Sequence, residues 1–159
     1  MRHPLRTPLS SAAALLLAAS LTGCGISIPT DPDRTLENVS GGELRVGASP
    51  DTGLIEAAGA TPSGPLADLV TTYAAELDAS TDWTVDSEET LVGMLEAGDL
   101  DLLVGGFTDQ TPWVDRAGMT RGYSSIEGAD GRKIVMLVPL GENAFLSNLE
   151  RFLDEEVGS

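Results

Sequence analysis

The sequence predicts an α/β fold, a single three-layer lobe built on a small, largely parallel sheet. Three observations support this prediction. Segments with the alternating period of a strand are interleaved with segments that have the helical period. The clearest helical segment carries its apolar side chains on one stripe. The chain has 159 residues, a length that normally supports one hydrophobic core.

The first half of the predicted lobe contains two strand–helix units. Residues 43–48 alternate apolar and polar side chains, which predicts a short strand. A loop rich in proline and glycine leads to a helix with its apolar stripe at Leu66, Leu69, Val70, Tyr73, Ala74 and Leu77. Residues 83–85 are a second strand candidate. Asp86 or Ser87 is expected to cap the next helix, which ends at Gly98.

The second half contains two further strands and a final helix. Residues 100–104 predict a third, mostly buried strand that ends at Gly105 and Gly106. The polar stretch 107–133 has no regular period, so we expect irregular structure there. The apolar run 134–138 predicts a fourth strand. The last helix carries Phe145, Leu146, Leu149, Phe152 and Leu153 on one face. Ligands of such sheets bind at the loops that follow the carboxyl ends of the strands.

The N-terminal segment has the pattern of an export signal. Arg2 and Arg6 supply a positive start, and the apolar stretch 12–21 that follows is shorter than the roughly 20 residues of a membrane span. The sequence Leu-Thr-Gly-Cys at 21–24 resembles the lipobox of bacterial lipoproteins, in which the cysteine is lipidated and becomes the new N-terminus. An ordinary secretory signal is the alternative. The only cysteine of the chain is Cys24, so it forms no internal disulfide.

These patterns divide the chain into three parts. We expect a signal peptide over 1–23, a lipid-anchored flexible tether over 24–42 and the lobe over 43–157. The tether is indicated by prolines, glycines and a lack of apolar periodicity. The expected location is the extracytoplasmic face of the cell membrane, where the protein is held by its lipid.

The charge of the chain excludes two kinds of partner. The formal net charge is −16, and removal of 1–23 takes away two arginines and no acids, which leaves −18. Such a surface argues against nucleic acid, whose phosphates are bound by lysine and arginine. It argues equally against direct docking on anionic lipid, so the acyl chains have to supply membrane attachment.

The residue inventory argues against an enzyme. The only histidine, His3, precedes the predicted cleavage site, and the only cysteine is the predicted lipidation site. No spacing of histidine and cysteine suggests a metal cage. We therefore expect no catalytic residue, no cofactor and no metal.

Several short motifs share an order and spacing with one family of proteins. They are the strand and turn 44–51, Ser-Gly-Pro at 63–65, Asp-Leu-Val at 68–70, Ala-Ala-Glu-Leu at 74–77, the run 95–108 with its Gly-Gly pair and Thr108, and Tyr123. With these motifs, residues 43–123 resemble the first lobe of bacterial extracellular solute-binding proteins of the polar amino-acid type, family 3. Members of that family fold as two lobes around a cleft, whereas this chain has the length of one.

The resemblance and the loop chemistry together define a candidate ligand rim: Asp51, Gly105, Gly106, Phe107, Thr108, Trp113 and Arg116. Glycines after a strand let backbone N–H groups face a ligand. In this interpretation Asp51 contacts an amine, Trp113 stacks on the ligand and Arg116 pairs with an anion. In the alternative interpretation, Asp51 only makes a turn, Trp113 caps the core and Arg116 pairs with nearby acids.

Two functions stay open from the sequence. The first is a membrane-tethered solute-binding lipoprotein that serves the transport of small, polar, amino-acid-like solutes, together with a permease and an ATPase. The second is a degenerate single lobe that acts as an interaction or regulatory module and contacts a membrane partner or a second copy of itself. A concave polar pocket at the candidate rim favours the first, and a flat apolar patch favours the second.

Overall fold

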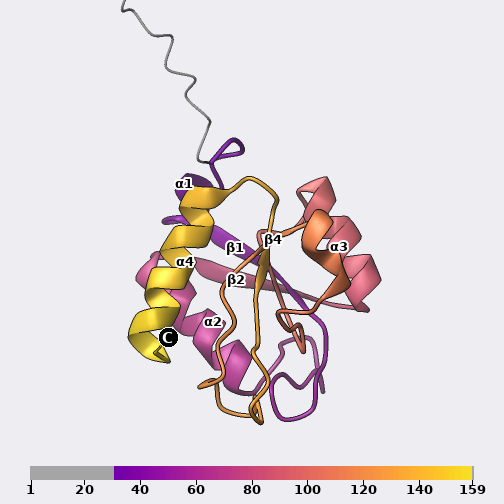
Figure 1. The fold of residues 1–159 in the computed structure, drawn as a ribbon. Coiled ribbons are helices and arrows are strands. Elements are labelled where there is room, and N and C mark those ends of the chain that lie inside the picture. The colour runs from indigo at the N-terminus through magenta and orange to yellow at the C-terminus, as the bar shows by residue number, and fades with distance from the viewer. Residues whose placement is uncertain (1–30, 159) are drawn as a thin grey trace, which may run out of the picture.

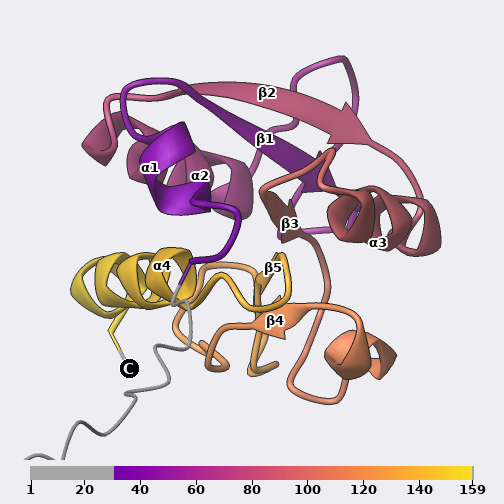
Figure 2. The same ribbon diagram turned by 90° about the horizontal axis from the view of Figure 1, so that it is seen from above.

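The computed structural model describes residues 31–158, which form a five-stranded mixed sheet between two layers of helices (Figure 1, Figure 2). The predicted signal peptide, Cys24 and the first residues of the predicted tether lie outside the described residues. In the described part of the chain, no helix is both long enough and apolar enough to span a membrane.

The sheet confirms the predicted fold class. Its strands are β1 (Glu43–Ala48), β2 (Ser80–Val85), β3 (Leu102–Val104), β4 (Gly118–Met119) and β5 (Leu137–Val138), in the order β2-β1-β3-β5-β4. β1 is parallel to both β2 and β3, and Val46 lies beside Trp83 on one side and Leu102 on the other. β5 is antiparallel to β3 and β4, so the parallel part of the sheet comprises β2, β1 and β3.

The helices cover the two faces of the sheet unequally. α1 (Thr35–Val39), α2 (Pro65–Glu76) and α4 (Asn143–Glu156) lie on one face, and α3 (Glu88–Ala97) lies on the other beside a 3-10 turn, η1 (Pro112–Asp115) (Figure 2). The larger core cluster lies under the first group and includes Tyr73, whose ring packs against Phe145 and Phe152. The smaller cluster lies under α3.

Local sequence explains where α3 begins and how closely it packs. The Ser87 side chain accepts a hydrogen bond from the Thr90 N–H at the start of the helix, and Gly98 ends it in the left-handed conformation at φ 78°. On the neighbouring strand, a Cβ at Gly47 would lie 2.7 Å from a methyl group of Leu100 and 3.1 Å from one of Leu91. Gly47 therefore allows the α3 layer to approach β1 closely.

The structure corrects the predicted boundary between tether and lobe. Residues 35–39, expected within the flexible tether, form α1, in which Thr35 and Val39 are buried. The buried carboxylate of Glu142 accepts the N–H groups of Asp33, at 2.8 Å, and Thr35, at 2.9 Å. The folded part therefore starts at or before Asp31. This anchoring depends on a residue far away in the sequence, so local composition gives no sign of it.

The second half of the sheet also differs from the prediction. Only Leu137 and Val138 of the apolar run 134–138 form a strand, and that strand is antiparallel to β3. The stretch 107–133, expected to be irregular, contains η1 and β4. β4 is only two residues long, too short to show a period in the sequence.

Candidate functional site

The carboxyl ends of β1 and β3 meet at one edge of the sheet. Ala48, the last residue of β1, pairs with Val104, the last residue of β3. The loops that follow, with Asp51 after β1 and the pair Gly105 and Gly106 after β3, therefore lie together. This is the edge at which an α/β sheet binds its ligands.

Asp51 presents a half-buried carboxylate at this edge. Its backbone closes a tight loop, because its carbonyl oxygen accepts the N–H groups of Leu54, at 3.0 Å, and Ile55, at 2.9 Å. Its side chain is paired with Arg132: Nη1 lies 3.0 Å from Oδ2 and Nη2 lies 2.8 Å from Oδ1. Asp51 thus makes the turn of one interpretation from the sequence, and its carboxylate pairs with a cation of the chain itself. Its contact with an amine of a ligand stays a prediction.

Sequence reasoning missed Arg132. It lies in the stretch 107–133, which has no regular period, and nothing in its neighbourhood in the sequence points to Asp51. The available signal was only its charge, because few cations lie in this part of an acidic chain. The paired Asp51 carboxylate raises the pKa of the Arg132 guanidinium, so this guanidinium keeps its positive charge.

The glycines after β3 are required by how closely the Asp51 loop approaches. A Cβ at Gly106 would lie 2.2 Å from Asp51 Oδ2, and a Cβ at Gly105 would lie 2.8 Å from the Ser49 carbonyl oxygen. A side chain at Gly106 would displace the Asp51 carboxylate, and one at Gly105 would displace the backbone that leads to it. In residues 31–158, the backbone N–H groups of Gly106, Phe107 and Thr108 donate to no protein acceptor.

The side chain of Phe107 belongs to the core. It is 2 % exposed and packs in the smaller core cluster, so of the predicted ligand contact only its backbone N–H remains at the edge. Thr108 stays at the edge and is partly exposed; its hydroxyl oxygen accepts the Gln110 N–H at 3.4 Å.

Trp113 and Arg116 lie apart from Asp51, against α3. The Trp113 indole donates to Glu88 Oε2 at 3.3 Å and packs on the smaller core cluster. Arg116 pairs with Glu96, near the end of α3, and its guanidinium lies 5.3 Å from the centre of the Trp113 ring. The structure thus matches the alternative interpretation of these two residues, in which one caps the core and the other pairs with an acid.

A cavity of about 310 Å³ marks the other edge of the sheet. Its lining includes Arg116, Arg45 at the amino end of β1, and Asp101 just before β3. Arg45 is engaged by Asp101, with Nη2 lying 2.6 Å from Oδ1, and by the Gly98 carbonyl oxygen at 2.7 Å. The prediction that Arg116 serves the carboxyl edge is therefore wrong, because this edge lies at the opposite ends of the strands.

Charge is distributed so that negative groups are in excess over residues 31–158. Each of the seven lysine and arginine side chains there forms an ion pair: Arg34, Arg45, Arg116, Arg121, Arg132, Lys133 and Arg151. All 25 acids of the chain lie in the same range, so most of them have no cation beside them. Within the described residues, no group of histidine, cysteine or acidic side chains has the arrangement of a metal site.

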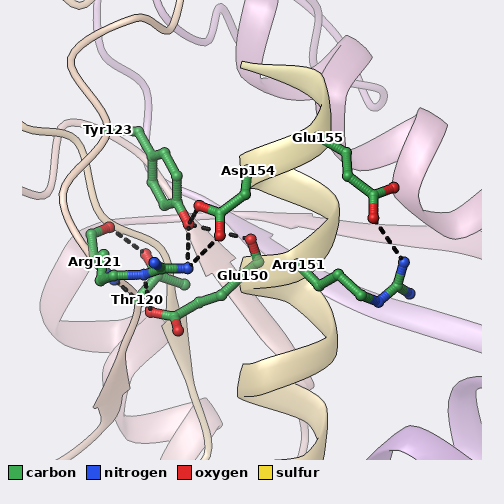
Figure 3. Close-up of polar contacts among 7 residues, drawn as sticks. All are labelled: Thr120, Arg121, Tyr123, Glu150, Arg151, Asp154 and Glu155. Carbon is green, nitrogen blue, oxygen red and sulfur yellow. Dashed lines mark hydrogen bonds and ion pairs between the residues drawn. The ribbon is translucent and has the colours of Figure 1, made fainter. Parts of the chain in front are cut away.

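A second polar cluster joins the segment after β4 to α4 (Figure 3). The Tyr123 hydroxyl contacts Asp154 Oδ1 at 3.0 Å and donates to the Glu150 carbonyl oxygen at 3.3 Å, and Arg121 Nη2 lies 2.6 Å from Asp154 Oδ2. Burial, reinforced by the hydrogen bond with Asp154, raises the pKa of Tyr123 to about 12. This cluster clamps the segment after β4 to α4.

Solved structures share this fold. Domain 1 of TmArgBP in its arginine-bound form, as a Phe57Trp mutant, is 21 % identical with a TM-score of 0.64, over 76 % of this chain and 96 % of that one. The unmutated domain 1, also arginine-bound, gives 20 % identity and 0.63, over 75 % and 97 %. An amino acid ABC transporter substrate-binding protein from Streptococcus pneumoniae, bound to L-arginine, gives 12 % and 0.63, over 78 % and 93 %.

These matches establish the architecture. No protein-family model matches the sequence, and no curated protein matches it either. At such low identity the likeness concerns the fold, and the fold is that of a single lobe of a periplasmic binding protein, as the sequence predicts.

Proposed function

We propose that this chain is a single-lobe solute-binding protein that captures a small amino-acid-like solute with a cationic group for transport. The observation that carries the proposal is the position of Asp51. Its half-buried carboxylate lies at the carboxyl edge of the parallel strands, beside the glycines that follow β3. A domain with this excess of negative charge attracts cations and repels anions.

The chemistry of the edge suits an amino acid. The Asp51 carboxylate pairs with an ammonium or guanidinium group of the solute through charge-assisted hydrogen bonds. The backbone N–H groups of Gly106, Phe107 and Thr108 have no protein acceptor in residues 31–158, so they are available for the carboxylate of the solute. Consecutive backbone N–H groups of this kind bind anions. The fold neighbours support this proposal, since three of them hold arginine and two of those are a single domain.

The interaction-module alternative lacks support at this edge. It requires a flat apolar patch there, but Phe107 is buried and its neighbours at the edge are Asp51, glycines and Thr108. Among the described residues, the large hydrophobic side chains that are exposed are Val114 on η1 and Leu140 beside the cavity at the amino edge.

The proposal includes a lipid anchor at Cys24 and a place on the outer face of the cell membrane, in the service of a membrane permease. The folded part begins at or before Asp31, so the tether of the proposal runs from Cys24 to about residue 30. A stretch of this length spans at most about 25 Å when fully extended, which would keep the lobe close to the membrane surface. The test is Cys24→Ser. We expect this variant to be released from membranes or left uncut, and unchanged membrane retention would contradict the anchor.

A binding experiment tests the solute site. L-arginine, L-lysine, L-glutamine and L-glutamate are titrated into the purified protein by calorimetry and screened by thermal shift. We expect a cationic amino acid to bind and to raise the melting temperature. Asp51→Asn should weaken binding by about 1.5–3 kcal/mol, roughly tenfold to a hundredfold.

Glu156→Gln is the matched control, because it removes one negative charge at the far end of α4. It should bind like the parent. Equal affinities of the parent and Asp51→Asn would show that the solute binds elsewhere. A melting temperature that no solute raises would instead favour the interaction module.

A further inference from the structure

The loop 124–133 connects the segment after β4 to the segment that leads into β5. Tyr123 and Ile134 bracket it with a pair of backbone hydrogen bonds, 2.8 Å from the Tyr123 N–H and 3.1 Å from the Ile134 N–H. Its side chains Ile126 and Ala129 are buried, 4 % and 0 % exposed. The loop is therefore fastened at its base and packed along its length.

Close backbone contact holds this loop against the loop that carries Asp51. Gly128 adopts φ +79°, and a Cβ on it would lie 2.0 Å from the carbonyl oxygen of Gly53. Both the conformation and the contact require glycine. Two turns then follow, with hydrogen bonds from the Ala129 N–H to Ile126 and from the Arg132 N–H to Ala129. These turns place the Arg132 side chain at the edge of the sheet.

All three nitrogens of the Arg132 guanidinium donate hydrogen bonds. Two of its nitrogens form the bidentate pair with Asp51, and its Nε donates to the Ala129 carbonyl oxygen at 3.1 Å. The two side chains keep part of their surface in solvent, 35 % exposed for Arg132 and 26 % for Asp51. Asp51 Oδ2 lies directly against Gly106. The space where a solute cation would meet the carboxylate is therefore filled by a cation of the chain itself.

We infer that Asp51 is a binding site for alkylguanidinium groups and that Arg132 occupies it as an internal ligand. The inference rests on the proposed function, and it adds that a solute has to displace Arg132 before it binds. The exchange breaks one carboxylate–guanidinium pair and forms another, and the displaced Arg132 guanidinium is released to solvent. Because only the molecules with Arg132 displaced can bind, the apparent affinity equals the intrinsic affinity multiplied by the fraction of such molecules.

The neighbouring cation provides a matched control. Lys133 is next in the chain and carries the same charge, but its Nζ lies 3.7 Å from Asp109 and its side chain is 65 % exposed. Within the described residues its ion pair is with Asp109, whereas Asp51 is paired with Arg132. Removing Lys133 therefore changes the local field by one charge without emptying the site.

The experiment compares L-arginine and methylguanidinium binding to the parent, Arg132→Ala and Lys133→Ala by calorimetry. We expect Arg132→Ala to bind both probes at least about tenfold more tightly than the parent, and Lys133→Ala to bind within about twofold of it. If the parent binds and Arg132→Ala binds no more tightly than Lys133→Ala, self-occupancy is wrong while the proposed function stands.

A second measurement needs no solute. In nuclear magnetic resonance spectra of the parent, the Arg132 Nη–H groups that donate to Asp51 should exchange slowly with water. They should exchange rapidly in Asp51→Asn but not in Glu156→Gln. The same slow exchange in Asp51→Asn would overturn the inference. If protection is lost in Asp51→Asn but no variant binds either probe, the internal pair is real and the proposed solute binding fails.

Discussion

The carboxylate of Glu142, just before α4, accepts the N–H of Thr35 at 2.9 Å, although the two residues are 107 positions apart in the chain. The other oxygen of the same carboxylate accepts the Asp33 N–H at 2.8 Å. A buried side chain from one end of the sequence thus supplies the acceptors that the first turn of α1 lacks. The N-terminal segment becomes part of the lobe through this contact.

Replacing this carboxylate should destabilise the lobe. In Glu142→Gln one of the two accepting oxygens becomes an NH₂ group that faces an N–H donor, so we expect a loss of about 1–3 kcal/mol in the free energy of unfolding at neutral pH. Urea denaturation measures it, and amide exchange at Thr35 reports the local effect. The exposed Glu156→Gln should stay within about 0.5 kcal/mol of the parent.

The pH dependence of this loss follows from the ionisation of Glu142. Burial opposes its charge, but hydrogen bonds from the Asp31 side chain and the N–H groups of Asp33 and Thr35 lower its pKa overall. Its contribution is therefore present above the unfolded pKa, about 4.3, and is lost as pH falls through the folded pKa. The stability gap between parent and Glu142→Gln should shrink in acid, and a gap that is constant down to about pH 2 would contradict the assignment.

Asp31 faces Glu142 and titrates in the opposite sense. Burial and then the hydrogen bond with Glu142 raise the pKa of Asp31. Its protonated form stabilises the fold, so this contribution is present in acid and is lost as pH rises through the folded pKa. Part of the stability gained at mildly acid pH should therefore disappear in Asp31→Asn, which keeps a neutral group there at every pH.

A methyl group at Gly106 should break the pair between Asp51 and Arg132. The added Cβ would lie 2.2 Å from Asp51 Oδ2, so the carboxylate has to move. We expect Gly106→Ala to cost about 1–3 kcal/mol of stability and to speed the exchange of the Arg132 Nη–H groups that donate to Asp51. Gly93→Ala is the control, because nothing lies within 4 Å of a Cβ there and the residue is inside α3. It should be neutral or stabilise by up to about 1 kcal/mol.

Local patterns predicted the parallel half of the sheet, and long-range contacts account for what they missed. Ser87 and Gly98 mark the ends of α3, and each acts within its own segment. By contrast, α1 depends on Glu142 and the orientation of Arg132 depends on Gly128 and Gly53. Such contacts join residues that are distant in the sequence, and no local period encodes them.

The sequence predicted only part of the candidate site, because local patterns do not encode contacts between distant residues. Asp51, Gly105 and Gly106 lie together at the predicted edge because the carboxyl ends of parallel strands gather there. Trp113 and Arg116 were assigned to that edge by their spacing after β3, but the chain turns back through η1 and leaves them along α3. The direction of a loop is not encoded in spacing, and Phe107 shows that a residue next to a site can still point into the core.

The Tyr123 clamp should affect stability without affecting the carboxyl edge. Tyr123→Phe removes the contacts with Asp154 and with the Glu150 carbonyl oxygen, at an expected cost of about 1 kcal/mol.

The parent's raised Tyr123 pKa of about 12 means that the neutral hydroxyl stabilises the fold and that this contribution is lost as pH rises through that value. In an absorbance titration, Asp154→Asn should lower the Tyr123 pKa but leave it above 10, because burial is the largest cause. An unchanged pKa would contradict the clamp.

Removing Arg116 should leave solute binding unchanged. Its guanidinium pairs with Glu96 and lies over Trp113, and it lines the cavity at the amino edge, whereas Asp51 lies at the carboxyl edge. The pair is exposed, 37 % and 39 % for the two side chains, so solvent screens it and its loss should barely change the melting temperature. In calorimetry with L-arginine, Arg116→Ala and the parent should agree within about twofold, while Asp51→Asn weakens binding tenfold or more. If Arg116→Ala weakens binding as much as Asp51→Asn, the solute instead lies near the amino-edge cavity, and the assignment of the site to the carboxyl ends of β1 and β3 is wrong.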